Sequence, residues 1–132
     1  METLRNFDIT IDINIINTIS GGNQEFEIKF TGKDKEQYKL TFERVWDMRY
    51  SIENASIMRF CEFRMHLPEG IVDNSIYVVE DSEYIKYFEY QVAHTRPVDD
   101  LIHYNVSDEV DTTLDILAIG KPKLEKINYP LY

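Results

Sequence analysis

Apolar and polar residues alternate strictly near the start of the chain. From Phe7 to Ile15 every second residue is Phe or Ile, and the residues between them are Asp, Thr or Asn. A period of two places the apolar side chains on one face of a strand. Glu25–Phe30 repeats the pattern after Ser20-Gly21-Gly22-Asn23, whose glycines can supply the positive φ of a turn. The pattern predicts two strands, over Phe7–Ile15 and Glu25–Phe30, joined as a hairpin.

The alternation continues through the middle of the chain with one shift of phase. A third strand is predicted from Tyr38 to Val45, and the phase changes near Val45-Trp46, where a β-bulge would redirect the chain. The alternation then resumes from Trp46 to Ile52. Two further apolar stretches, Ile57–Met65 and Ile71–Val79, predict additional strands.

The period then changes from two to that of a helix. Asp81-Ser82 offers an N-cap, and Glu83 places a negative charge in the first turn, where the helix dipole favours it. Pro97 cannot continue a helix. The pattern predicts one main helix over residues 82–94. Its apolar stripe comprises Tyr84, Ile85, Phe88 and Val92.

The remaining sequence returns to strands. Leu101–Val106 and Thr113–Ile119 predict a hairpin linked by Ser107–Asp111, and Leu124–Tyr129 predicts an edge segment. The fold class expected for the 132 residues is therefore α+β in a single domain. We expect a mostly antiparallel sheet, curled or in two layers, with one helix against it. One small helix cannot cover such a sheet, so a sandwich-like closure or a homodimer is expected.

Charge narrows the class of partner. The chain carries 14 basic and 24 acidic residues, a net charge of −10. Between Asp73 and Asp115 there are eleven acidic and two basic residues, so this segment holds most of the excess. Such a surface repels nucleic acid and attracts a basic protein, although it also serves solubility alone. The hypothesis of a basic partner requires these carboxylates to share one exterior patch.

The cellular compartment is inferred from what the sequence lacks. The single cysteine, Cys61, cannot form an intrachain disulfide, which fits a reducing compartment. No signal-peptide pattern begins the chain, and no apolar run is long enough for a membrane helix. We expect a cytoplasmic protein that does not bind membranes.

No motif predicts a catalytic centre, a metal site or a cofactor. His103 follows Asp100, but on a strand the two would point to opposite faces, so we expect a satisfied, semi-buried or surface histidine. Cys61 and His66 are separated in the same way, and a buried thiol is the simpler interpretation. The acidic stretch from Asp108 to Asp115 lacks the central glycine of a calcium loop.

Two groups of residues are candidates for binding. Three arginines of the middle strands could ring an anion-binding pocket, or pair with nearby glutamates on the surface; they are Arg49, Arg59 and Arg64. Tyrosines recur at spacing three along the predicted helix. We expect the first to join the core; for the later two, core packing is the default interpretation and exposure at a protein interface is the alternative. The predicted partner-binding residues are Tyr87, Tyr90, Asp99, Asp100, Asp108, Glu109 and Asp111.

Three stretches together resemble a known group. They are Tyr38–Val45, Asp81–Phe88 and the segment from Ile102 to Leu117. The layout is similar to a loose group of small acidic uncharacterised proteins of Gram-positive bacteria, some of which look like immunity proteins that protect a cell from its own secreted toxin. The resemblance spans residues 38–127 and brings no catalytic motif with it.

Three functions follow as hypotheses. The first is a non-catalytic protein-binding domain, an immunity protein that neutralises a basic toxin partner. The second is a structural or assembly subunit, which would show an apolar exposed sheet face. The third is a small-molecule-binding protein or enzyme with a site near Arg49, Arg59 and Arg64. We expect the first, and we expect that the protein is not an enzyme.

Overall fold

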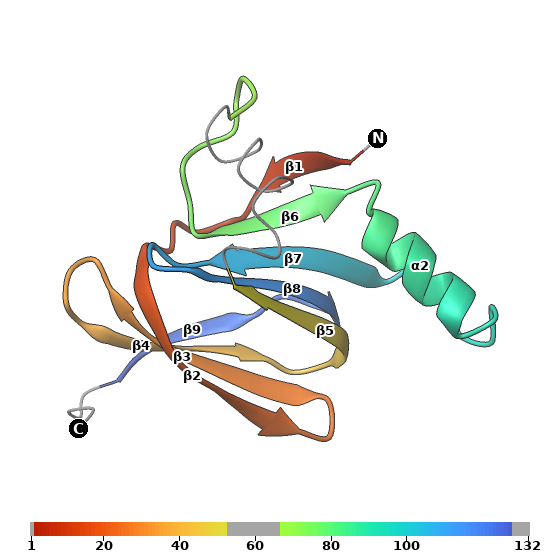
Figure 1. Cartoon of the computed structure of the whole chain (residues 1–132), viewed down its shortest axis with the longest axis horizontal. Coiled ribbons are helices and arrows are strands. Elements are labelled where there is room, and N and C mark those ends of the chain that lie inside the picture. Colours follow the sequence, from red (N-terminus) through yellow and green to blue (C-terminus); the bar gives the residue numbers. More distant parts are fainter. Residues whose placement is uncertain (1, 53–66, 128–132) are drawn as a thin grey trace.

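Two antiparallel sheets and one helix form the molecule, as the computed structural model shows (Figure 1). The structure describes residues 2–52 and 67–127. Its strands are β1 (Thr3–Asn6), β2 (Ile13–Gly22), β3 (Glu25–Gly32), β4 (Gln37–Phe42), β5 (Val45–Ile52), β6 (Ile76–Glu80), β7 (Leu101–Ser107), β8 (Thr112–Ile119) and β9 (Lys123–Ile127). The helix is α2 (Glu83–Gln91).

The predicted α+β class and its two-layer arrangement are confirmed. One sheet has five strands in the order β1-β6-β7-β8-β5, and the other has four in the order β2-β3-β4-β9. The inward faces of the two sheets share one apolar core, in which side chains of β3 and β4 meet those of β6, β7 and β8. The opposite face of the five-stranded sheet receives α2, through a smaller cluster around Tyr84, Phe88, Leu101 and Leu117.

The predicted strand from Phe7 to Ile15 is correct only for its last three residues, which begin β2, and its pattern of burial is correct in part. Phe7 and Ile11 are buried and Ile9 is exposed, but the backbone between β1 and β2 is not in a ladder. It instead bonds to the segment before β6, where Ile11 N–H donates to Asn74 Oδ1 at 2.8 Å. This segment carries the chain from one sheet to the other, and Phe7 and Ile11 pack in the core between the sheets while Ile9 stays exposed.

The predicted hairpin of the first long strands is confirmed as β2–β3, with a tighter turn than expected. Gly22 pairs with Glu25, so the loop is the two residues Asn23 and Gln24, both with positive φ. Positive φ at both positions is typical of the two-residue turn that matches the twist of a hairpin. The glycine that the hairpin requires is Gly21, in the strand itself, at φ +155°.

A Gly21→Ala variant is expected to lose more than about 1 kcal/mol of unfolding free energy. A Cβ at this position would lie 2.1 Å from the backbone oxygen of Glu25, which cannot move without breaking the turn. The neighbouring Gly22→Ala is the matched control, because nothing lies within 4 Å of its Cβ position. Urea unfolding followed by Trp46 fluorescence would compare the two; equal midpoints would contradict the steric account.

The predicted bulge at the phase shift is confirmed. Val45 pairs with Ala118 and Asp47 pairs with Leu117, so Trp46 is the extra residue between the two pairs. The chain changes sheets immediately before it, between β4 and β5. Val45 faces the core between the sheets and Trp46 packs in the cluster beneath α2. Because of the extra residue, Asp47 lies on the same side as Trp46, and Met48 returns to the core between the sheets. A simple continuation of the alternation predicts that Trp46 and Met48 share a face. The structure places them on opposite faces of the sheet.

The helix begins as predicted and ends early. Ser82 is the N-cap, and its hydroxyl accepts from the backbone N–H of Ile85. The helix ends at Gln91 rather than near residue 94, because Ala93 and His94 both adopt positive φ. Two consecutive left-handed residues end the helix before Pro97 is reached.

The later strands follow the prediction with shifted ends. The β7–β8 hairpin is confirmed, and β9 is the edge of the four-stranded sheet. The predicted strand Ile71–Val79 begins only at Ile76, because the residues before it bond to the crossing segment. The predicted strand Ile57–Met65, together with Cys61, Arg59 and Arg64, lies outside the described residues.

Candidate functional site

A chain of three polar side chains lies buried beneath the start of α2. Ser82 Oγ is 2.7 Å from His103 Nδ1, and His103 Nε2 is 2.6 Å from Asp115 Oδ1. All three residues are buried, and His103 is fully so. Asn105 Nδ2 donates to the same oxygen of Asp115 at 3.3 Å. The expectation of a surface or semi-buried histidine is wrong, because His103 is fully buried, but both of its ring nitrogens have hydrogen-bond partners.

A serine, a histidine and a carboxylate bonded in this order also form the catalytic triad of serine hydrolases. An ionised Asp115 would accept from His103 Nε2, which leaves Nδ1 to accept the hydroxyl proton of Ser82. A nucleophile must also reach its substrate. Ser82 Oγ is instead buried and accepts the N–H of Ile85 at 3.0 Å as the helix cap. The geometry therefore supports a structural connection between α2, β7 and β8.

A second polar contact fixes the next turn of the helix against β5. The hydroxyl of Tyr84 donates to Asp47 Oδ2 at 2.7 Å, and its ring meets His103 edge-on. The guanidinium carbon of Arg49 lies 3.8 Å from the centre of the Tyr84 ring and 5.3 Å from that of Tyr87. In the described part of the chain no carboxylate forms an ion pair with Arg49. Its donors are therefore held in place by aromatic rings and stay available to a ligand.

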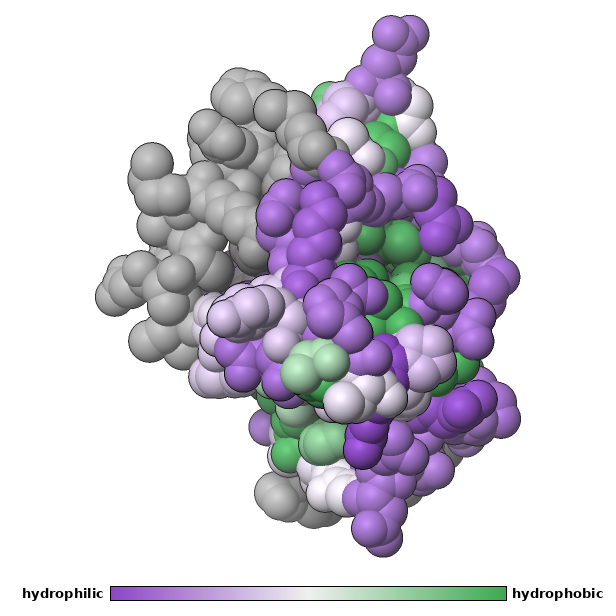
Figure 2. Space-filling view, turned by 90° about the vertical axis from the view of Figure 1, so that its right-hand side faces the viewer, coloured by the Kyte–Doolittle hydropathy of each residue, from purple (hydrophilic) through white to green (hydrophobic). Residues whose placement is uncertain are grey.

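Around this arginine the helix and β5 present an aromatic surface. Tyr87 and Tyr90 are 53% and 73% exposed, so the default interpretation of core packing is wrong for both, and the alternative of exposed side chains is correct. A hollow of about 320 Å³ separates the helix from the bulge. It is lined by Trp46, Asp47, Tyr87, Phe88, Gln91 and Val92. We call the group Trp46, Arg49, Tyr87, Tyr90 and Gln91 the aromatic surface. Figure 2 views the molecule from the side on which α2 projects, and shows mostly hydrophilic side chains with smaller hydrophobic areas between them.

The predicted acidic patch divides into two. Asp99 and Asp100 precede β7 beside the helix cluster, whereas the acidic residues of the hairpin follow its far end. The seven residues of β7 separate the two groups by about 20 Å. Asp115 is buried and belongs to neither group. The assumption of one exterior patch is therefore wrong, because the hairpin places its turn at the opposite end from α2.

The two acidic groups also differ in their contacts. Asp108 Oδ1 accepts the backbone N–H groups of three residues of its own turn, and Glu109 forms a 2.7 Å ion pair with Lys33. Asp111 Oδ1 accepts from the hydroxyl of Thr112. Asp99 and Asp100 are exposed and form no ion pair within the described ranges. The group beside α2 is thus less engaged in contacts within the fold than the group at the hairpin.

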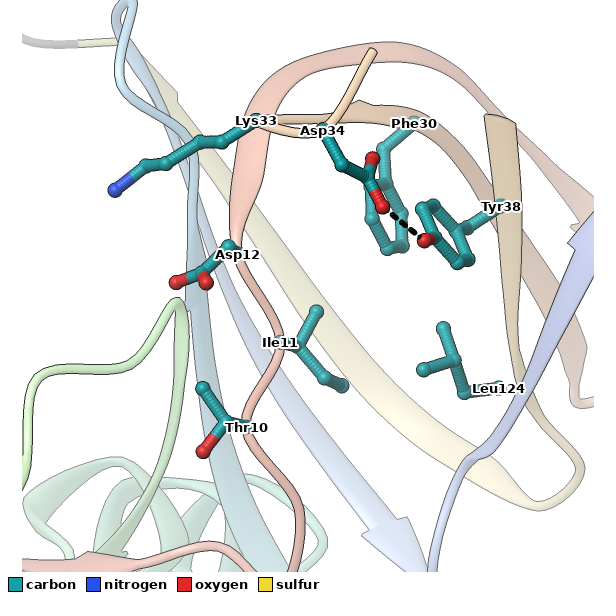
Figure 3. Close-up of a pocket in the computed structure, with 8 residues that line it drawn as sticks. All are labelled: Thr10, Ile11, Asp12, Phe30, Lys33, Asp34, Tyr38 and Leu124. Atoms are coloured by element: carbon teal, nitrogen blue, oxygen red, sulfur yellow. Dashed lines mark hydrogen bonds between the residues drawn. The ribbon is translucent and has the colours of Figure 1, made fainter. Parts of the chain in front are cut away.

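A smaller hollow of about 190 Å³ lies between the four-stranded sheet and the segment that joins β1 to β2 (Figure 3). Ile11 and Leu124 face it, and the Tyr38 hydroxyl donates to Asp34 beside the stacked ring of Phe30. This volume is below the roughly 300–1,000 Å³ of typical ligand pockets. Arg49, the described member of the predicted arginine pocket, does not line it.

Sequence reasoning missed the link between Ser82, His103 and Asp115. The signal was present in the hairpin, because Asp115 is a carboxylate within an otherwise apolar strand. With the observed register, Asn105 pairs with Asp115 and His103 pairs with Leu117, so these side chains share one face of the sheet. One sequence does not fix that register, and the serine comes from a separate element.

Buried tyrosines predict a loss of stability at alkaline pH. Burial raises the pKa of Tyr104 to about 12, and burial together with the bond to Asp47 raises the pKa of Tyr84 further. A raised pKa in the folded state means that the stability is complete below pH 10 and falls as the unfolded chain ionises above it. We expect the urea midpoint to fall from pH 10 to pH 12, and a Tyr104→Phe variant to fall less steeply. Equal slopes would contradict the assignment.

Neither metal-ligand clusters, nor membrane-spanning helices, nor known relatives indicate a function for the described residues. Within residues 2–52 and 67–127, no group of three or more His, Cys, Asp or Glu is arranged to hold a metal ion. In the same ranges no helix has the length and apolar character needed to cross a bilayer. Comparison with protein families, curated proteins and solved structures finds no match.

Proposed function

We propose that this chain is a non-catalytic protein-binding domain that contacts its partner through the aromatic surface of α2 and β5. The observation that carries the proposal is Arg49, held between two tyrosine rings with no carboxylate partner in the described structure. Arg, Tyr and Trp are the residues that most often dominate binding energy at protein interfaces. The hollow beside Trp46 is of a size to accept a side chain of the partner.

We further propose that the partner is basic and that the protein acts in the cytoplasm as an immunity protein. Asp99 and Asp100 support a basic partner, because they lie beside the helix cluster, are exposed and have no ion pair within the described ranges. Carboxylates at the rim of an interface mainly increase the association rate, whereas the aromatic centre supplies affinity. The acidic hairpin at residues 108–111 is not included, since its side chains are engaged within the fold.

Co-expression with each product of the neighbouring genes tests the proposal. We expect one basic product to co-elute with the protein in size-exclusion chromatography and to separate from it at high salt more readily than at low salt. Co-elution should be lost in an Asp99→Lys, Asp100→Lys variant at low salt. Failure of every neighbouring product to form a complex would contradict the immunity function.

A serine hydrolase is the second candidate, favoured only by the order of Ser82, His103 and Asp115. A fluorophosphonate probe distinguishes the two functions, because it reacts with an activated and accessible serine. Our proposal predicts no adduct on the native protein by intact-mass spectrometry. A stoichiometric adduct that is lost in Ser82→Ala would support the hydrolase and contradict the assignment as a binding domain.

A further inference from the structure

The strand β2 forms an edge of the four-stranded sheet and carries no charged residue along its ten positions. The other edge strands that the structure describes all contain charges: Arg5 in β1, Asp47 and Arg49 in β5, and Lys123, Glu125 and Lys126 in β9. Charges on an edge prevent pairing with another chain. An uncharged edge in a protein of net charge −10 is therefore the exception that needs a physical reason.

Part of this edge is already covered by the molecule itself. Asp108 Oδ2 accepts the N–H of Ile16 at 3.0 Å, and the N–H of Glu109 donates to Asn14 O at 3.1 Å. Two register shifts against β3 also fall in this first half, before Thr18. They twist that half away from regular pairing.

The second half, Thr18–Gly22, is regular and open. It pairs residue by residue with β3, and in the described structure no strand lies on its other side. Because Gly22 closes the two-residue turn, alternate residues bond to β3, and Ile19 directs its N–H and C=O to the free side. The exposed side chains here are small and neutral, and Ile19 is only partly buried against the core.

We infer that the occupant of this edge is β2 of a second copy, paired antiparallel about a two-fold axis at Ile19. Two copies of this acidic chain repel one another where their carboxylates come close. Because β2 carries no carboxylate, two copies can pair along this strand without that repulsion. The axis at Ile19 sets the two Ile19 residues opposite each other at the margin of both cores, and sets Thr18 of each copy opposite Ser20 of the other. The two four-stranded sheets then form one continuous sheet, and the aromatic surfaces stay outside the contact.

Sedimentation equilibrium of the full chain tests this pairing. The parent protein should show twice the chain mass of 15.7 kDa. A Thr18→Lys, Ser20→Lys variant places introduced lysines opposite lysines, and should weaken the dimer by about tenfold or more. The charge-matched control is Thr3→Lys, Tyr50→Lys, which alters exposed positions on the two edge strands of the other sheet and should remain dimeric.

A mixing experiment separates pairing from misfolding. A Thr18→Glu, Ser20→Glu variant should also be monomeric alone, but should form a heterodimer with the lysine variant, because opposite charges then face each other. A monomeric parent, or lysine and glutamate variants that fail to restore the dimer on mixing, would overturn the inference.

Discussion

His103→Ala is expected to lower the free energy of unfolding by about 3–5 kcal/mol. The imidazole is fully buried and is the 2.6 Å partner of the buried Asp115 carboxylate. Without the imidazole, the Asp115 carboxylate keeps only the longer bond from Asn105 within this group of buried polar side chains. A cavity also remains beneath α2. Urea unfolding monitored by circular dichroism would measure the difference.

Two further variants show whether the loss comes from the hydrogen-bond chain. Ser82→Ala removes the helix cap and the contact with Nδ1, and should cost about 1–2 kcal/mol. His94→Ala removes an exposed histidine near the end of the helix and should change stability by less than about 0.5 kcal/mol. A His103→Ala protein as stable as His94→Ala would contradict the structural role of the chain.

Arg49→Ala is expected to weaken binding of the basic partner by about 30-fold, equivalent to about 2 kcal/mol. The guanidinium lies over the Tyr84 ring at 3.8 Å, so it donates from a fixed position and loses little entropy on binding. Arg49→Lys should restore little, because a lysine cannot present the planar donor fork that stacks on a ring. Isothermal titration calorimetry would give the dissociation constants.

The matched control for this prediction is Arg5→Ala. Arg5 is also an exposed arginine on an edge strand, but it lies on β1, at the far edge of the same sheet, and pairs with Glu80 of β6. Its removal should leave the dissociation constant within about twofold. Equal losses in the two variants would indicate a general charge effect and not a site at Arg49.

The sequence predicts the elements of this fold better than their ends. Local signals found the β2–β3 and β7–β8 hairpins, the Ser82 cap and the bulge before Asp47, because turn residues, a capping side chain and a phase shift act within a few positions. The strand assigned to Phe7–Ile15 failed over most of its length because the partners of that segment, Asn74 and Ser75, lie more than sixty residues away. The alternation of apolar residues indicates which side chains are buried, and a side chain can be buried without its backbone pairing in a sheet.

The candidate site, too, was predicted only in part, because local signals do not show which distant segments lie side by side. Helical spacing left both core packing and exposure open for Tyr87 and Tyr90. The position of Arg49 beside Tyr87 depends on β5 lying at the edge next to β8. The count of charges from Asp73 to Asp115 was correct, but it did not imply one acidic patch, because the β7–β8 hairpin directs its acidic turn away from α2. Strand order, which one sequence does not provide, decides both outcomes.

Hydrogen–deuterium exchange of the complex with the basic partner tests the central claim most directly. The account predicts slower exchange on binding in α2, in residues 92–100 and in β5, with no change at the β7–β8 turn of residues 108–111. Protection confined to that turn, or to the edge of β2, would contradict the assignment of the aromatic surface as the binding site.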